Sequence, residues 1–149
     1  MKTHPDARIP QRQTPGSTCA DLHALLPDGV DELVILPGER CAVETGLRVA
    51  IPEGWEIQVR ARSGISLKHG ITMANGIGSI DSDFRGMLAV LVVNLDREAY
   101  TIRNGDRIAQ MKVSQVPPWI AQEVEDLDDT ERGQGGFGST GMSAEKAGK

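Results

Sequence analysis

The chain has 149 residues, of which 39% are hydrophobic and 25% are charged, as in an ordinary soluble domain. Its formal net charge is −5, with 16 Lys and Arg against 21 Asp and Glu, which excludes a broad electrostatic contact with nucleic acid. No apolar run approaches the ~20 residues that cross a bilayer, and the polar segment 1–14 lacks the apolar core of a secretory signal.

The cysteines indicate a reducing environment, and the histidines argue against a zinc site built by the protein. Cys19 and Cys41 are too few for a disulfide framework. The three histidines are scattered, without the spacing of zinc ligands. We therefore expect a cytoplasmic protein with neither a membrane nor a nucleic-acid partner.

Segments rich in Ile, Val and Leu indicate strands, since only 3% of the residues are aromatic and β-branched side chains favour extended backbone. In one segment, Ile57 and Val59 alternate with polar residues; Leu88–Val93, in contrast, is uninterrupted and should be buried on both faces. Turn signals such as Pro-Asp-Gly and Asn-Gly-Asp separate the segments. We predict strands over Leu33–Leu36, Ala42–Ile51, Glu56–Arg62, Leu88–Leu95 and Arg107–Val113.

One short helix is predicted, from Ser63 to His69, with Ser63 as its cap and Gly70 ending it in the left-handed conformation. No other stretch between residues 20 and 118 holds a helical period. Many short strands with frequent turns are typical of an all-β sandwich or barrel.

The composition changes after Pro117-Pro118. Glu123–Glu131 is acidic, and the chain from Arg132 onward is rich in glycine and serine, so it buries too little apolar surface to fold alone. A disordered tail is one interpretation. The other is a lid over a nucleotide, because the segment 132–141 combines an arginine, a phenylalanine and hydroxyls with glycines that let backbone N–H groups approach an anion.

Two clusters suggest phosphate chemistry. Ala61–Ser66 lies where a strand meets the short helix, where free N–H groups, Arg62 and Ser63 favour an anion; a capped turn with a solvated arginine is the alternative. In Asn75–Gly86, acids flank a serine, and a carboxylate can orient and deprotonate a water. The alternative there is a turn rich in Asp and Asn.

Two further segments are less distinctive. Gly105–Met111 begins as a turn, which a hairpin with a local Asp–Arg pair would explain, but Gln110 places an amide inside an apolar strand, where it needs a partner. Ser17–Ala24 contains Asp21, which alone is uninformative.

Taken in order, these segments resemble the five motifs of the trimeric dUTP pyrophosphatase (dUTPase) family, from about Thr18 to Gly141. The resemblance implies a distorted jelly-roll β-barrel with one short helix and a flexible arm, assembled as a homotrimer with active sites at subunit interfaces. It divides the chain into an N-terminal extension (1–15), a barrel (16–120) and an arm (121–149) that carries the fifth motif (132–141).

The resemblance also implies the reaction. dUTP and water would give dUMP and pyrophosphate, lowering dUTP to keep uracil out of DNA and supplying dUMP for thymidylate synthesis. Mg²⁺ would be held mainly by the triphosphate. Asp81 matches the carboxylate that activates water for attack on the α-phosphorus, Gln110 a residue near that water, and Ser63 a donor to the oxygen bridging to the leaving group. Asp21 matches an acid that holds the metal through water.

The remaining positions match substrate contacts. Arg62, Ser63 and Gly64 match the phosphate motif, and Ala89 a backbone contact. The residues that match the uracil pocket are Asn75, Gly78, Ser79 and Ile80. Phe84 stands where the family usually has a tyrosine that packs against the deoxyribose. In the arm, Phe137 matches the ring that stacks on uracil. The arm residues that match the family's phosphate contacts are Arg132, Gly138, Ser139 and Thr140.

Three positions depart from the family pattern without removing a catalytic group: Cys19 for Gly, Ala61 for Pro and Met87 for a polar residue. A dCTP deaminase of the same fold is an alternative, but it needs a Glu on a central strand, and Leu88–Leu95 holds no acid. A non-catalytic, dUTP-binding regulatory trimer is another, although such a binder gains little from Asp81.

Overall fold

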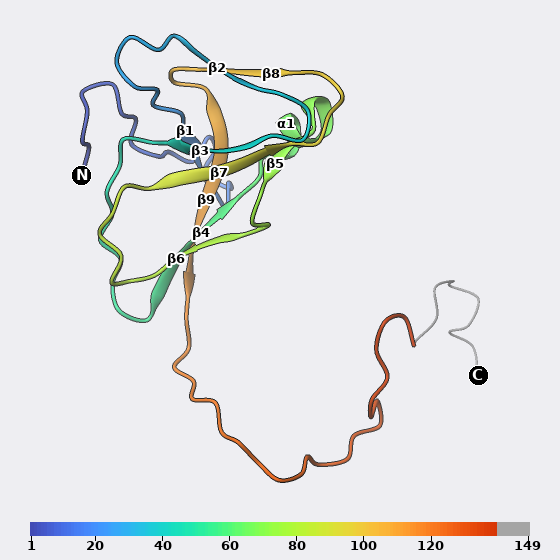
Figure 1. Ribbon diagram of the computed structural model, residues 1–149. Helices are drawn as coiled ribbons and strands as arrows, with labels where there is room; N and C mark the ends of the chain where they lie inside the picture. The colour runs from blue at the N-terminus through green and yellow to red at the C-terminus, as the bar shows by residue number, and fades with distance from the viewer. Residues whose placement is uncertain (140–149) are drawn as a thin grey trace. The chain divides into compact units, whose positions relative to one another are not determined.

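The computed structural model describes residues 1–139, which divide into a unit over Met1–Pro118 and a second from Trp119 onward. In the first unit (Figure 1) the elements are β1 (Ala20–His23), β2 (Glu32–Ile35), β3 (Arg40–Glu44), β4 (Trp55–Arg60), α1 (Ser63–His69), β5 (Ile71–Met73), β6 (Gly78–Ile80), β7 (Ala89–Asn94), β8 (Tyr100–Arg103) and β9 (Arg107–Gln115). No helix in this described part is long and apolar enough to span a bilayer.

The strands form three antiparallel sheets, with the orders β1-β9-β4-β6, β2-β8 and β3-β7-β5. The long strand β9 pairs with β1 on one side and with β4 on the other. This arrangement makes β9 the element that joins the beginning of the chain to its middle.

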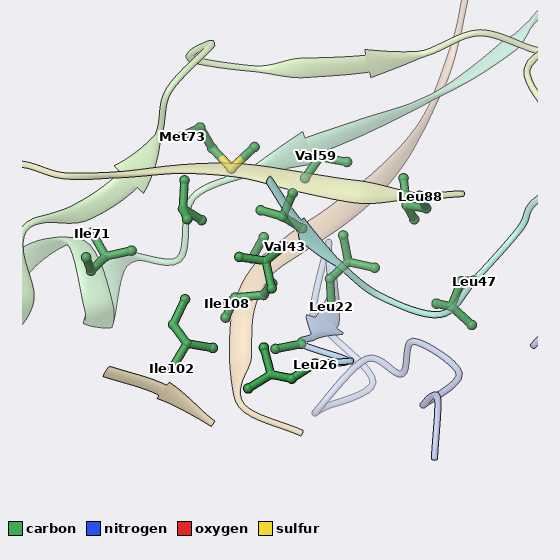
Figure 2. Packing of buried hydrophobic residues seen from close by; sticks show 14 of the residues in the cluster. Leu22, Leu26, Val43, Leu47, Val59, Ile71, Met73, Leu88, Ile102 and Ile108 are labelled. Atoms are coloured by element: carbon green, nitrogen blue, oxygen red, sulfur yellow. The ribbon is translucent and has the colours of Figure 1, made fainter. Parts of the chain in front are cut away.

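Aliphatic side chains from all three sheets form the core. Figure 2 shows them pointing toward one another, with Leu22 from β1, Val43 from β3, Val59 from β4 and Ile102 from β8 among them. All four are at most 2% exposed. A core built from Ile, Val and Leu holds these short strands together without large aromatic side chains.

All five predicted strands are present, with shifted ends. The segment predicted over Ala42–Ile51 stops at Glu44, because Gly46 turns the chain with φ 67°. β1, β5, β6 and β8 were not predicted, since strands of three or four residues show too little periodicity.

The predicted alternation in β4 is confirmed, with Ile57 and Val59 buried. The prediction that Leu88–Val93 is buried on both faces is wrong for this chain. Leu88, Val90 and Val92 are buried, but Leu91 is 41% exposed. The strand therefore covers the core with one face only.

The predicted helix is confirmed over Ser63–His69, and Gly70 ends it at φ 61° in the left-handed region. The predicted cap is wrong. Arg62 is the N-cap, no side chain caps the helix, and Ser63 is its first residue. The Ser63 hydroxyl is therefore not used in capping.

We predict that Gly70→Ala lowers the free energy of unfolding by about 2 kcal/mol or more, since the φ is unfavourable and an added Cβ would lie 2.6 Å from the Asp96 backbone nitrogen. Gly38→Ala is the control, with φ +79° but nothing within 4 Å of the added Cβ, and should cost only about 1 kcal/mol. Urea unfolding at one protein concentration measures both. Equal losses would contradict the role given to the Asp96 contact.

Candidate functional site

A polar pocket of about 320 Å³ lies where three segments distant in sequence converge. They are the stretch before and at the start of β1, the β4–α1 junction, and the first half of β9. The pocket is lined by Gln13, Ser17, Thr18, Cys19, Asp21, Arg62, Ser63, Gly64, Arg107 and Gln110. The structure thus brings together, in one pocket, five of the residues named from the sequence motifs: Asp21, Arg62, Ser63, Gly64 and Gln110.

Asp21 is held between two arginines at the base of this pocket. Its Oδ1 accepts a hydrogen bond from Arg62 Nε at 3.0 Å and its Oδ2 one from Arg107 Nη1 at 3.2 Å. Arg62 Nη1 also donates to the Arg107 carbonyl at 3.0 Å. Asp21 is only 7% exposed, so its negative charge is compensated by both guanidinium groups.

Gln110 fixes the β4–α1 junction. Its Nε2 donates to the Ala61 carbonyl at 2.8 Å, which confirms the expectation that this amide needs a partner. Gln110 lies opposite Asp21 across β1–β9 and opposite Arg60 across β9–β4, so it shares a sheet face with Asp21. The amide oxygen and the second N–H of Gln110 remain available to the pocket.

The second predicted group, Asn75–Phe84, does not line this pocket. Asn75 lies in the β5–β6 turn. An added Cβ on Gly78 would lie 3.3 Å from Asn75 Nδ2 and 3.5 Å from the Val59 Cβ. The small residue at 78 therefore lets the Asn75 amide lie directly against β6.

Asp81 follows β6 in an exposed turn that is closed by a hydrogen bond from Phe84 N to the Asp81 carbonyl at 3.2 Å. The Phe84 ring covers Gly86, where an added Cβ would lie 2.6 Å from the ring. Phe84 is 39% exposed. This loop therefore carries an exposed carboxylate and a partly exposed aromatic ring three residues apart.

The two groups lie at opposite ends of β4. Ile80 pairs with Ile57, so Asp81 continues toward Glu56, whereas Ser63 lies beyond the other end. From residue 56 to residue 62 an extended chain advances about 20 Å. Figure 1 shows the loop after β6 and helix α1 apart in the same way. One phosphorus atom cannot contact both groups within a single chain.

The remaining predicted contacts lie elsewhere. Ala89 begins β7 opposite Glu44. In the arm, Arg132 Nε donates to the Gly135 carbonyl at 2.8 Å, and Phe137 is fully exposed with a positive φ of 44°. Gly138 and Ser139 are exposed, and Thr140 lies outside the described residues.

His23, at the end of β1, is a neutral neighbour of the charged pocket residues. Burial, and then the nearby Arg8 guanidinium, lower the pKa of His23, while Asp21 opposes this shift. Its buried Nδ1 has no hydrogen-bond partner within residues 1–139. A neutral His23 leaves Arg62 and Arg107 as the positive groups of the pocket.

Sequence reasoning missed the pairing of Arg107 with Asp21. The alternative of a local Asp–Arg pair in a hairpin is not what the structure shows, because β8 and β9 do not pair and Asp106 Oδ2 accepts a hydrogen bond from Arg103 N at 2.8 Å. Arg107 reaches Asp21 through the β1–β9 register, which the sequence does not display. Gln13 and Thr18 were missed as well, because polar loop residues carry no periodic signal.

We predict that Asp21→Asn lowers the free energy of unfolding by about 3 kcal/mol, because it leaves two adjacent arginines without their buried counter-charge. Glu32→Gln is the control, since the Arg103–Glu32 pair is exposed, with side chains 61% and 48% accessible, and should cost less than about 1 kcal/mol. Denaturant unfolding of both variants at pH 7 checks this. An Asp21→Asn protein as stable as the control would contradict the structural role of the carboxylate.

Comparison with known proteins gives the same fold and family. The family model described as dUTPase matches residues 5–141. The deoxyuridine 5'-triphosphate nucleotidohydrolase of Caulobacter vibrioides is 53% identical over 137 residues, covering 92% of this chain and 88% of the relative. That of Wolinella succinogenes is 49% identical over 143 residues, covering 96% and 93%.

Among solved structures, the Staphylococcus bacteriophage 80alpha dUTPase with dUpNHpp superposes with a TM-score of 0.83 at 25% identity, covering 95% of this chain and 96% of that one. The predicted all-β, jelly-roll fold is thereby confirmed. The matched family model spans four of the site segments and the arm motif together. The chain therefore belongs to the dUTPase family.

Proposed function

We propose that this protein hydrolyses dUTP to dUMP and pyrophosphate, acting as a dUTP diphosphatase in the cytoplasm. The single observation that carries the proposal is the convergence of Asp21, Arg62, Ser63 and Gln110 on one polar pocket, in a chain of the dUTPase family. The activity would keep dUTP low, so that uracil stays out of DNA, and would supply dUMP for thymidylate synthesis.

The chemical step is attack of water on the α-phosphorus. The Asp81 carboxylate orients the water and accepts its proton as the new oxygen–phosphorus bond forms. The bond from the α-phosphorus to the α,β-bridging oxygen breaks, and pyrophosphate leaves with the electron pair. The water oxygen therefore ends in dUMP.

The pocket stabilises the charge that develops on the phosphates. Arg62 and Ser63 supply donors at the phosphate chain, with the Gly64 backbone beside them, and Ser63 suits the bridging oxygen, where negative charge grows in the transition state. Its exposed hydroxyl is not used to cap α1. Gln110, held by Ala61, keeps its other amide atoms for the attacking water or the α-phosphate.

Magnesium fits this site as an ion held by the substrate. Within residues 1–139 no three His, Cys, Asp or Glu side chains lie close enough together to hold a metal. Asp21 is the acid of the pocket; each of its oxygens accepts one guanidinium N–H and retains a lone pair for a metal-bound water. When bound, Mg²⁺ neutralises charge on the phosphate oxygens.

The separation along β4 supports a homotrimer with interfacial sites. Because Asp81 continues toward residue 56 and Ser63 follows residue 62, positions that are about 20 Å apart along an extended chain, the Asp81 loop of one copy must meet the pocket of another. A heterologous contact that closes a ring provides this arrangement at each interface.

The same loop would hold the nucleoside. Asn75 and the backbone of Gly78, Ser79 and Ile80 would pair with the uracil edge, leaving no space for a thymine methyl and leaving polar groups unpaired with cytosine. The Phe84 ring, partly exposed in the turn that Asp81 begins, provides a packing face for deoxyribose.

The arm would complete the site. Phe137 is fully exposed in a glycine-rich segment, which suits stacking on the uracil ring. Arg132 provides a guanidinium for the γ-phosphate, with Gly138, Ser139 and Thr140 as further donors.

The direct test is incubation with dUTP, dTTP, dCTP and UTP and separation of the products. We expect dUMP and pyrophosphate from dUTP and little turnover of the other three. Ammonia from dCTP would instead indicate a deaminase, although β7 carries no acid. Binding of dUTP without turnover would indicate the regulatory alternative.

We predict that Asp81→Asn lowers kcat for dUTP by roughly 10²–10⁴-fold, the usual contribution of a general base. Glu53→Gln, which neutralises an exposed carboxylate in the turn before β4, is the control and should keep the activity. Steady-state measurement of kcat for dUTP in both variants checks this prediction. Similar activities for the two would show that Asp81 is not the base.

We predict that Phe137→Ala, or removal of the residues after Arg132, lowers turnover sharply, while light scattering shows an unchanged oligomer. Phe137→Trp preserves a stacking face and should retain activity. Full activity of the shortened chain would show that the arm is only a tail.

A further inference from the structure

The N-terminal extension contributes Gln13 to the pocket wall, beside Asp21 and Ser63, and the segment that joins the extension to β1 contributes Ser17 and Thr18. The sequence motifs assigned no role to these three residues. A wall residue with a polar side chain is a candidate contact for the phosphate chain.

The extension is anchored before it reaches the pocket. The Lys2–Leu47 bridge adds it to the chain after β3, and Thr3 N donates to the Gly46 carbonyl at 2.8 Å. Ala7 is 4% exposed and belongs to the core. The segment is therefore fixed to the barrel and is not a loose tail.

Two further contacts hold Gln13 at the pocket. On one side, the Gln11 carbonyl accepts a hydrogen bond from Asp21 N at 3.2 Å. On the other, Thr14 N donates to Ser17 Oγ at 3.1 Å, and Ser17 N donates to the Thr14 carbonyl at 3.1 Å. The first contact ties Gln11, two residues before Gln13, to the strand that carries Asp21.

The Gln13 amide has donor capacity to spare. Within the described chain its side chain makes one hydrogen bond, a long 3.5 Å contact from Nε2 to the Gln11 carbonyl. The arginines of the pocket, by contrast, already donate to Asp21. An amide donor would add a phosphate contact without adding charge to the site.

We propose that Gln13 is a substrate-contact residue that donates from Nε2 to an oxygen of the outer phosphates of dUTP. This rests on the proposed function, in which the neighbour's Asn75–Phe84 segment holds the nucleoside and the α-phosphate faces Ser63 and Gln110. The rest of this chain's pocket, including Gln13, is then left for the β- and γ-phosphates.

The experiment compares Gln13→Ala with Gln11→Ala in the full-length protein. The two glutamines lie in the same segment, but of the two only Gln13 lines the pocket. Gln13→Ala should raise KM for dUTP about fivefold with kcat unchanged, the effect of one exposed hydrogen bond. Gln11→Ala should match the wild type.

Two ligands locate the contact. Binding of dUpNHpp should weaken about fivefold in Gln13→Ala, whereas binding of dUMP, which lacks the outer phosphates, should not change. Equal weakening of both ligands would overturn the placement at the outer phosphates. An unchanged KM and unchanged dUpNHpp affinity would overturn the contact itself.

Two charged variants distinguish a phosphate contact of Gln13 from simple packing of its side chain. Gln13→Glu should weaken dUpNHpp more than Gln13→Ala does, because its carboxylate repels phosphate, and Gln13→Lys should bind at least as tightly as the wild type. Equal affinities for the Glu and Lys variants would contradict the proposal. Wild-type protein that fails to hydrolyse dUTP would instead refute the proposed function.

Discussion

The length of β4 is the constraint on which the account of the site depends. An extended strand advances about 3.3 Å per residue and cannot bend back on itself, so the Asp81 loop at one end and the Ser63 pocket at the other are kept apart. β6 is locked to β4 by the pairing of Ile57 with Ile80, so the separation does not depend on the conformation of a loop. A site that needs both groups must then be built from more than one chain.

Within one chain, the pocket is organised by Asp21. Its carboxylate holds Arg62 and Arg107 from two different strand ends, and Gln110 fixes the backbone just before Arg62 through Ala61. Charge is thereby concentrated and oriented before a ligand arrives, which is the form of preorganisation that favours developing negative charge in a transition state.

Much of this organisation was predictable and some was not. The helix over Ser63–His69 with its Gly70 end followed from local signals, and the five-motif pattern identified the family. The short strand β1 did not, because its pairing with β9 is a long-range contact without a periodic signature. For the same reason the Asp21–Arg107 pair, 86 residues apart in sequence, was invisible until the register was known.

The most direct test of a shared site mixes two inactive variants, Asp81→Asn and Ser63→Glu, by refolding them together. Ser63→Glu repels phosphate, while an acid in the first helical turn is compatible with α1. Each interface takes Asp81 from one chain and Ser63 from its neighbour. In a random mixture about one quarter of the interfaces of a closed ring therefore combine an intact Asp81 with an intact Ser63, and activity should return to about that fraction of wild type. A mixture no more active than its separate components would contradict a site divided between chains.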